Sequence, residues 1–189
     1  MSRYLIQDHR FIDNFLILLG AALSSADRFA SRVVLGRFIG MISSEENDYF
    51  QRSFSALGVT EAERAGQPDG EPTKGLKAIM REAVETGLYA ATLSVLAVAE
   101  GVYMDWGLRA TQPYPENFVH AEWITLHNKP DFCEFVAFLR SELDRVGPEN
   151  AELCRNYFIR TVQLEKAFFD DAYKPDVSQG FSMACYAPV

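Results

Sequence analysis

The sequence is poor in cysteine and in basic residues, and each shortage argues against a class of protein. The three cysteines, Cys133, Cys154 and Cys185, are odd in number and have no CxxC spacing, so they indicate neither a disulfide framework nor a zinc cage. Lys and Arg total 18 against 26 Asp and Glu, and the net charge of −8 opposes binding to nucleic acid or to an anionic membrane. We therefore expect a protein of the reducing cytoplasm with no nucleic-acid partner.

Long hydrophobic runs are also missing. The apolar stretches around residues 15–19 and 97–99 end well short of the roughly 20 residues that a bilayer-spanning helix needs. No basic segment precedes an apolar stretch at the start, so we expect no signal peptide and no membrane contact. A Gly-rich phosphate loop, a GxSxG elbow and an HExxH motif do not occur.

The sequence is rich in apolar residues at helical spacing. Hydrophobic residues make up 48% of the chain, which is too many for a disordered protein, and they recur three and four positions apart without sustained alternation. Clusters of Gly and Pro mark the breaks. We predict an all-α multi-helix bundle forming one domain over residues 1–173, followed by a tail of residues 174–189. The predicted helices cover residues 3–23, 26–57, 73–86, 88–110, 116–127, 131–146 and 149–173.

Three carboxylates lie on the apolar faces of predicted helices. Asp8 continues the spacing of Phe11 and Phe15 in the first helix, and Glu100 and Glu165 hold the same inward position in two others. Burying an unpaired carboxylate costs several kcal/mol, so each needs protonation or a partner. A structural partner could satisfy any one of them, whereas three on separate helices favour a shared polar pocket.

Two histidines and two further glutamates are candidates for the same pocket. His120, Trp123 and His127 share one helix face and could orient a flat heterocycle, although a core histidine bonded to a backbone carbonyl is at least as good an interpretation of His127. Glu45 and Glu46 are interpreted as a solvated face and not as part of the pocket, although one of them could approach it. A di-iron site needs Glu-x-x-His pairs, and none occurs, so we expect no metal and no cofactor.

Several short stretches, in this order, resemble those of one known family. They are residues 4–8 (YLIQD) with Phe11, residues 99–103 (AEGVY) with Trp106-Gly107, residues 122–124 (EWI), and residues 162–165 (VQLE) with Phe168-Phe169 and Ala172-Tyr173. From about residue 4 to residue 173 the chain resembles the TenA (thiaminase II) family of thiamin-salvage hydrolases. The resemblance implies the all-helical, haem-oxygenase-like fold without haem.

The resemblance also implies roles for residues. Asp8 matches an aspartate that contacts the aminopyrimidine ring, and Glu165 matches a catalytic acid or base. The larger branch of the family carries a nucleophilic Pro-Cys pair where this chain reads Val98-Ala99-Glu100, so it resembles the branch with glutamate there. That branch is associated with hydrolysing aminopyrimidine breakdown products of thiamin, including formylated ones. The implied catalytic residues are Glu100 and Glu165, and the implied substrate-binding residues are Asp8, Phe11, Tyr103, Trp106 and His120.

Some features depart from the family pattern and leave alternatives open. Alignment on Tyr103 puts the lost cysteine at Ala99, one residue from Glu100, and His120 stands where many relatives have tyrosine. Relatives normally have a further helix ahead of the Gln-Asp motif, whereas this sequence begins within a few residues of that motif. A misplaced start codon, a neighbouring subunit that covers the gap, or drift from the activity would each explain this difference. A pyrimidine-binding or regulatory protein without catalysis, and a haem or di-iron oxidase on the same fold, are the alternatives.

A homodimer or larger homo-oligomer is also expected. The apolar residues that could pack against a partner subunit lie in the predicted helices 26–57 and 131–146, although core packing alone explains most of them. They are Phe29, Val33, Phe38, Phe132, Phe135 and Phe138.

Overall fold

The structure is a computed structural model, and it describes residues 1–174. This part of the chain is a bundle of helices joined by short turns, without a strand, so the predicted fold class is confirmed. The predicted tail lies outside the described residues, apart from Lys174. The helices are α1 (Ser2–Ser25), α2 (Phe29–Met41), the π-helical turn η1 (Ile42–Glu46), α3 (Asn47–Ala56), α4 (Glu61–Gly66), α5 (Glu71–Glu85), α6 (Tyr89–Arg109), α7 (Phe118–Leu126), α8 (Pro130–Val146), the 3₁₀ turn η2 (Pro148–Asn150) and α9 (Ala151–Ala172).

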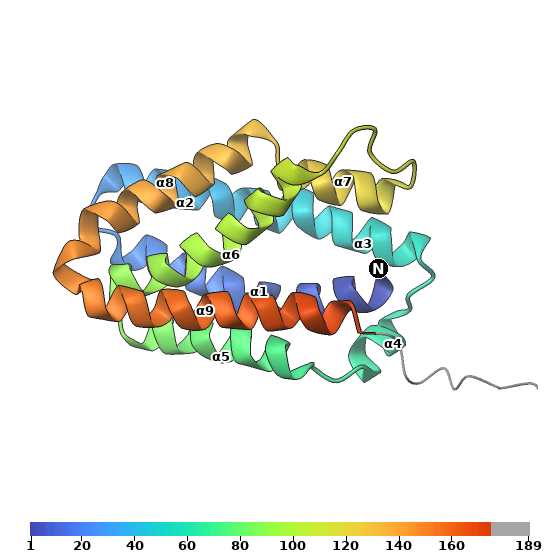
Figure 1. The fold of residues 1–189 in the computed structure, drawn as a ribbon, viewed down its shortest axis with the longest axis horizontal. Coiled ribbons are helices and arrows are strands. Elements are labelled where there is room, and N and C mark those ends of the chain that lie inside the picture. The colour runs from blue at the N-terminus through green and yellow to red at the C-terminus, as the bar shows by residue number, and fades with distance from the viewer. Residues whose placement is uncertain (175–189) are drawn as a thin grey trace, which may run out of the picture.

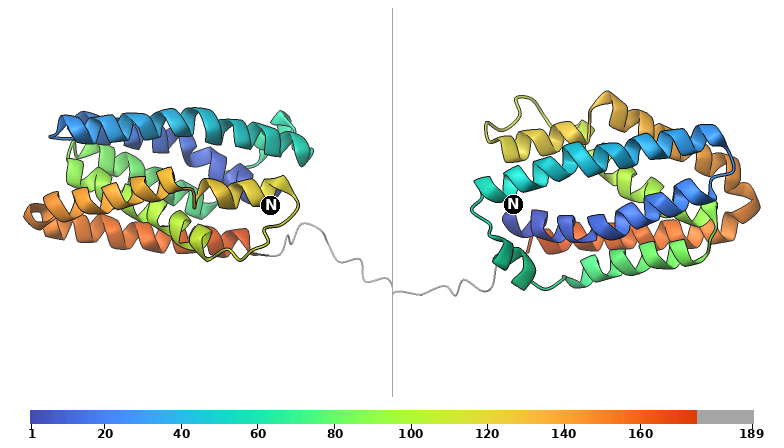
Figure 2. Two further views of the ribbon diagram at one scale, coloured as in Figure 1. Left: turned by 90° about the horizontal axis from the view of Figure 1, so that it is seen from above. Right: turned by 180° about the vertical axis from the view of Figure 1, so that it is seen from behind.

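Helix α6 forms the centre of the bundle. It crosses obliquely between α8 and α9 (Figure 1), and all residues from Tyr89 to Glu100 are buried. A helix that is apolar around its whole circumference has to be covered on all sides. Helices α1, α5 and α9 pack against one another on one side of α6, and α2 with α3 runs along the other side of α1 (Figure 2). No helix within residues 1–174 is both long and apolar enough to cross a bilayer.

The structure departs from the predicted helices in two places, apart from small shifts of helix ends. The predicted helix 26–57 is α2, η1 and α3 in succession, interrupted by one π-helical turn. The short helix α4 was missed because it lies in a stretch rich in Gly and Pro, where we predicted a loop. Its start is nevertheless encoded locally, since Thr60 and Glu63 form a reciprocal capping box.

The loop before α5 is held on α1 by polar contacts. The Gln7 side chain donates to the Pro68 carbonyl at 3.0 Å and accepts from the Gly70 amide and the Thr73 hydroxyl, both at 2.8 Å. These bonds satisfy a buried amide side chain and fix α5 beside the first two turns of α1. They therefore fasten the part of α1 that carries Asp8 to the start of α5.

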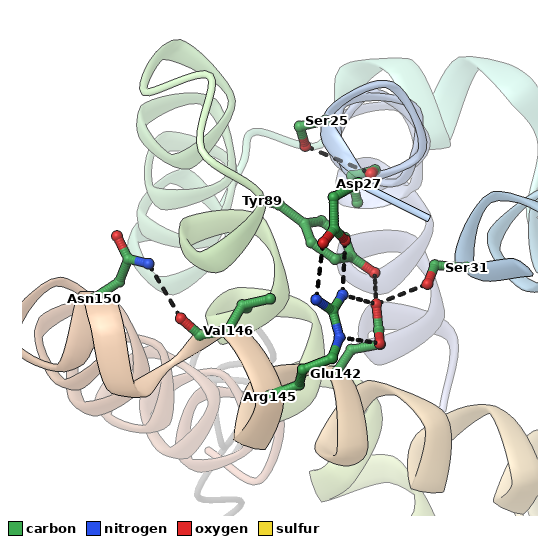
Figure 3. Close-up of polar contacts among 9 residues, drawn as sticks. Ser25, Asp27, Ser31, Tyr89, Glu142, Arg145, Val146 and Asn150 are labelled. Carbon is green, nitrogen blue, oxygen red and sulfur yellow. Dashed lines mark hydrogen bonds and ion pairs between the residues drawn. The ribbon is translucent and has the colours of Figure 1, made fainter. Parts of the chain in front are cut away.

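A buried carboxylate, Glu142, forms a network of polar contacts where α2, α6 and α8 meet (Figure 3). Glu142 accepts hydrogen bonds from Ser31 at 2.8 Å and Tyr89 at 3.0 Å, and Arg145 donates to both of its oxygens. Arg145 also pairs with Asp27 through both terminal nitrogens, at 2.9 and 2.7 Å. Every group in this network has a partner, so it joins three elements without leaving a reactive group.

The aromatic residues considered for a subunit interface lie mostly in the core. Phe38, Phe132 and Phe135 are 4%, 2% and 4% exposed, and the Phe38 and Phe135 rings stack on each other. Phe29 is exposed, whereas Val33 and Phe138 are partly buried. Of the two interpretations, core packing therefore holds for Phe38, Phe132 and Phe135, because α2 and α8 bury them against each other. The homo-oligomer stays a prediction.

Candidate functional site

The acids predicted on apolar faces come together in the middle of the bundle. Asp8 from α1, Glu100 from α6 and Glu165 from α9 are 1%, 7% and 1% exposed. A void of about 20 Å³ is lined by Asp8, Glu100 and a fourth acid, Glu46, which lies at the end of η1. Glu165 lies close enough to raise the pKa of Glu100 by its charge. The void has room for about one water molecule.

Burial is the main reason that the pKa values of these four carboxyls are raised. It raises the pKa of Asp8 to about 7 and, together with the charge of Asp8, raises the pKa values of Glu46 and Glu165 to about 8. The pKa of Glu100 is raised well above its usual value, first by burial and then by the charges of Glu46, Glu165 and Asp8. Groups with such values can exchange protons near neutral pH.

Glu165 stands out because neither of its carboxyl oxygens has a hydrogen-bond partner within residues 1–174, although both are buried. Buried polar atoms in folded proteins are nearly always paired. Burying a carboxyl group without hydrogen bonds costs several kcal/mol. The unpaired oxygens of Glu165 therefore indicate a place that a ligand or water fills.

Asp8 is held by a chain of aromatic donors. The Tyr103 hydroxyl donates a short hydrogen bond to Asp8, the Tyr4 hydroxyl donates to Tyr103 at 3.4 Å, and the Trp123 indole donates to Tyr4 at 3.2 Å. The bond from Tyr103 favours the charged form of Asp8 and opposes the effect of burial on its pKa. Asp8 is therefore the acid of this group that ionises most readily.

A larger pocket lies on the outer side of Tyr4. Its volume is about 720 Å³, and it is lined mainly by aromatic and aliphatic side chains, among them Tyr4, Trp106, Trp123 and Phe169. Most small-molecule sites are pockets of this size and character. Tyr4 belongs to the wall of the outer pocket and Tyr103 to the wall of the inner void, so their contact separates the two spaces.

The structure divides the residues predicted for substrate binding between these two spaces. Phe11 and Tyr103 line the inner void with Asp8, and the Phe11 ring packs edge-on against Phe168. Trp106 and His120 line the outer pocket instead, where His120 is exposed to solvent. The set predicted as one site therefore has an inner, acidic part and an outer, aromatic part.

His127 is a core histidine bonded to a backbone carbonyl, which is one of the two interpretations drawn from the sequence. Its Nδ1 lies 2.8 Å from the Trp123 carbonyl oxygen, and burial lowers its pKa to about 4. The ring also lines the inner void, so it contributes a neutral wall there. No group of three or more His, Cys, Asp or Glu side chains within residues 1–174 is placed to hold a metal ion.

Glu46 is the residue that sequence reasoning placed wrongly. It was interpreted as part of a solvated face but is 8% exposed, whereas its neighbour Glu45 faces solvent and pairs with Lys129 at 2.5 Å. The signal was present in the sequence, because Glu46 follows Phe38 and Ile42 at spacings of four, as Asp8, Glu100 and Glu165 follow their own apolar neighbours.

Comparison with known proteins now adds to this geometry. The model of the TENA/THI-4/PQQC family matches residues 1–174. The chain belongs to this family. A search among curated proteins finds no match.

Solved structures of family members share the fold at low sequence identity. A TenA family transcription regulator from Silicibacter sp. TM1040 is 18% identical, with a TM-score of 0.77 over 91% of this chain and 80% of that chain. A TenA homologue from Pyrococcus furiosus is 19% identical, with a TM-score of 0.76 over 90% and 82%. A candidate TenA-like thiaminase from Sulfolobus solfataricus P2 is 18% identical, with a TM-score of 0.73 over 89% and 77%. The bundle is therefore the haem-oxygenase-like fold of the TenA proteins.

Within this family member the place of the expected cysteine is part of the inner site. Ala99 and Glu100 both line the void, so the one-residue ambiguity in the alignment does not move the position away from it. The two cysteines in the described part of the chain, Cys133 and Cys154, do not line this void. Of these two residues only Glu100 has an ionisable side chain, and Cys185 lies outside the described residues.

Proposed function

We propose that this TENA/THI-4/PQQC family member hydrolyses an aminopyrimidine breakdown product of thiamin, whose side-chain amine is either free or formylated. The family membership and the likeness to a candidate thiaminase support a thiamin-related substrate. The single observation that carries the hydrolysis is Glu165, a fully buried carboxyl with two unpartnered oxygens beside Asp8 and Glu100.

The environments of the two glutamates differ. Burial and the charge of Asp8 raise the pKa of Glu165 to about 8, whereas burial and the charges of three acids, Glu46, Glu165 and Asp8, raise the pKa of Glu100. Glu165 is therefore the general base and Glu100 the general acid, because two carboxyls in unlike environments divide the two tasks between them. Each task contributes roughly 10²–10⁴ to the rate.

The proposed step conserves atoms and charge. Water gives a proton to the Glu165 carboxylate while its oxygen bonds to the carbon that carries the departing nitrogen. The carbon–nitrogen bond then breaks, and Glu100 gives its proton to that nitrogen. The products are an alcohol and ammonia or, from a formylated substrate, formate and the free amine. Proton transfer from Glu165 to Glu100 restores the starting state.

Asp8 holds the ring in this proposal. A carboxylate that already accepts a hydrogen bond from Tyr103 can accept another from a pyrimidine amine, which orients the substrate. The void of about 20 Å³ is much smaller than a pyrimidine ring, so the ring enters from the outer pocket and the Tyr4–Tyr103 contact opens.

Turnover of aminopyrimidines by Glu165→Gln tests the proposal. We expect a loss of roughly 10²–10⁴ in kcat, measured as ammonia or formate released, with the fold kept because Gln has nearly the same shape. Glu152→Gln is the matched control, since Glu152 is exposed on the same helix. Equal rates in the wild type and Glu165→Gln would remove Glu165 from the reaction.

The second candidate function is a pyrimidine-binding or regulatory protein without catalysis. The small inner void favours it, because a ring confined to the outer pocket stays away from Glu165. A ligand that raises the melting temperature of the protein without giving any product supports this candidate. Product formation that depends on Glu165 decides for the hydrolase.

A further inference from the structure

Glu46 lines the inner void but has no role in the proposed hydrolysis. It closes the π-helical turn η1, between Ile42 in the core and Tyr49, which is fully buried. Single π-helical turns inside α-helices occur frequently at functional sites. Here the turn presents Glu46 to the inner void and leaves Glu45 in solvent.

The groups around Glu46 contain more acids than bases. Asp8 from α1 and Glu100 from α6 line the same void, together with neutral His127. Lys129, in the turn before α8, is the cation that acts on Glu46 and lowers its pKa, but it forms its ion pair with Glu45. Two carboxyls that face one water-sized space without a cation between them cannot both ionise easily.

Glu46 also acts on Glu100 by its charge. Among the charged neighbours that raise the pKa of Glu100, Glu46 has the largest effect, ahead of Glu165 and Asp8. Interacting carboxyls of this kind release their protons in two steps that belong to the pair.

We propose that Glu46 is a positioning residue of this site, which shares a proton with Glu100 across the water-sized void and keeps Glu100 protonated as the acid. The proposal rests on the proposed function in one respect, the role of Glu100 as proton donor. The sharing of the proton is a property of the empty site and can be measured without substrate.

The substrate-free test is a carboxyl ¹³C NMR titration of Glu100 in the wild type, Glu46→Gln and Glu45→Gln. Gln keeps the shape of Glu46 but cannot ionise, so Glu100 should ionise about one pH unit lower in Glu46→Gln. Glu45→Gln is the matched control, one residue away and exposed, and should leave the titration unchanged. An unchanged Glu100 titration in Glu46→Gln overturns the proposal.

Glu100→Gln tests the pair from the other side. If the two carboxyls share a proton, the Glu46 carboxyl titrates in two steps in the wild type and in a single step in Glu100→Gln. This arm decides the question if Glu46→Gln fails to fold. A Glu46 titration that is the same in Glu100→Gln and in the wild type also overturns the proposal.

The pH profile of turnover separates a positioning role from a purely structural one. The alkaline fall of kcat reports the loss of the proton from Glu100, so it should move about one unit lower in Glu46→Gln and stay in place in Glu45→Gln. A lower melting temperature with an unmoved profile means that Glu46 only supports the fold. If no aminopyrimidine is turned over, the proposed function fails, while the NMR titration still decides whether the proton is shared.

Discussion

Two buried glutamates at different places in the bundle have opposite environments. Glu142 is 7% exposed and accepts hydrogen bonds from Ser31, Tyr89 and Arg145, which lowers its pKa through the Arg145 contact first (Figure 3). Glu165 is 1% exposed, has no hydrogen-bond partner for either oxygen in the described part of the chain, and has a pKa raised to about 8. Burial alone therefore does not distinguish a structural acid from a candidate catalytic acid, and the partners do.

The difference shows where free energy is gained and where it is given up. The Glu142 network joins α2, α6 and α8, so its charge stabilises the fold. Glu165 makes the folded state less stable whenever it ionises, and the charge of Asp8 adds to that cost. A site that gives up stability in this way is typical of one selected for binding or chemistry.

The largest expected effect is the change that Glu165→Leu makes to the pH dependence of the free energy of unfolding. A carboxyl whose pKa is raised from 4.5 to about 8 on folding contributes stability that is complete below pH 4.5 and is lost as the pH rises through 8. Leu does not ionise, so the variant should gain roughly 3–5 kcal/mol in unfolding free energy over the wild type between pH 4 and pH 9. Urea unfolding at both pH values measures it. The same pH slope in both proteins would contradict the unpartnered state of Glu165.

Glu142→Gln should show the opposite sign. The pKa of Glu142 is lowered, so its contribution is present above pH 4.5 and is lost as the pH falls. We expect a loss of about 2–3 kcal/mol at pH 7, because Arg145 keeps Asp27 but loses a charged partner, and a smaller loss at pH 3. Glu149→Gln is the control, exposed near the same end of the bundle. An equal loss at both pH values would show that packing, and not charge, is what the substitution removes.

The same two glutamates show how far sequence reasoning reaches. The spacing rule that found Asp8, Glu100 and Glu165 also applies to Glu46, and to Glu142 behind Phe135 and Leu139. It finds inward-facing acids because helical periodicity is local. It cannot tell which acid has a partner, since Ser31 and Tyr89 reach Glu142 from 111 and 53 residues away.

The fold was easier to predict than the site for the same reason. Helices α1, α6, α8 and α9 follow from the apolar spacing of their own residues, and their bounds lie close to the predicted ranges. Helix α4 was missed because its capping box, Thr60 with Glu63, was hidden among Gly and Pro. The division of the site into an inner void and an outer pocket depends on the Tyr4–Tyr103 contact between α1 and α6, which spacing within one helix does not show.

Tyr103→Phe removes the hydroxyl that donates a hydrogen bond to Asp8. Asp8 then resembles Glu165 in being a buried carboxyl that has lost a hydrogen-bond partner. The pKa of Asp8 should then rise above about 7, since the bond to Tyr103 lowers it. At pH 7 the substrate meets less of the carboxylate form, and we expect about a tenfold higher KM, the equivalent of one hydrogen bond to a charged group. At pH 9 the two proteins should differ less. A KM ratio that is independent of pH would show that the Tyr103 hydroxyl contacts the substrate and does not act through Asp8.

The smallest effect is expected for Tyr4→Phe, which tests the boundary between the two spaces. The ring keeps its packing on Trp123, Phe168 and Phe169, so stability should fall by only about 0.5–1 kcal/mol. Without the hydroxyl, the link to Tyr103 is gone and ligand should pass inward faster. Both tryptophans of the chain, Trp106 and Trp123, line the outer pocket, so stopped-flow fluorescence with an aminopyrimidine resolves filling of this pocket from a slower inward step. Acceleration of the slow step alone indicates that Tyr4 controls access to Glu165, whereas an unchanged slow step places the barrier elsewhere in the bundle.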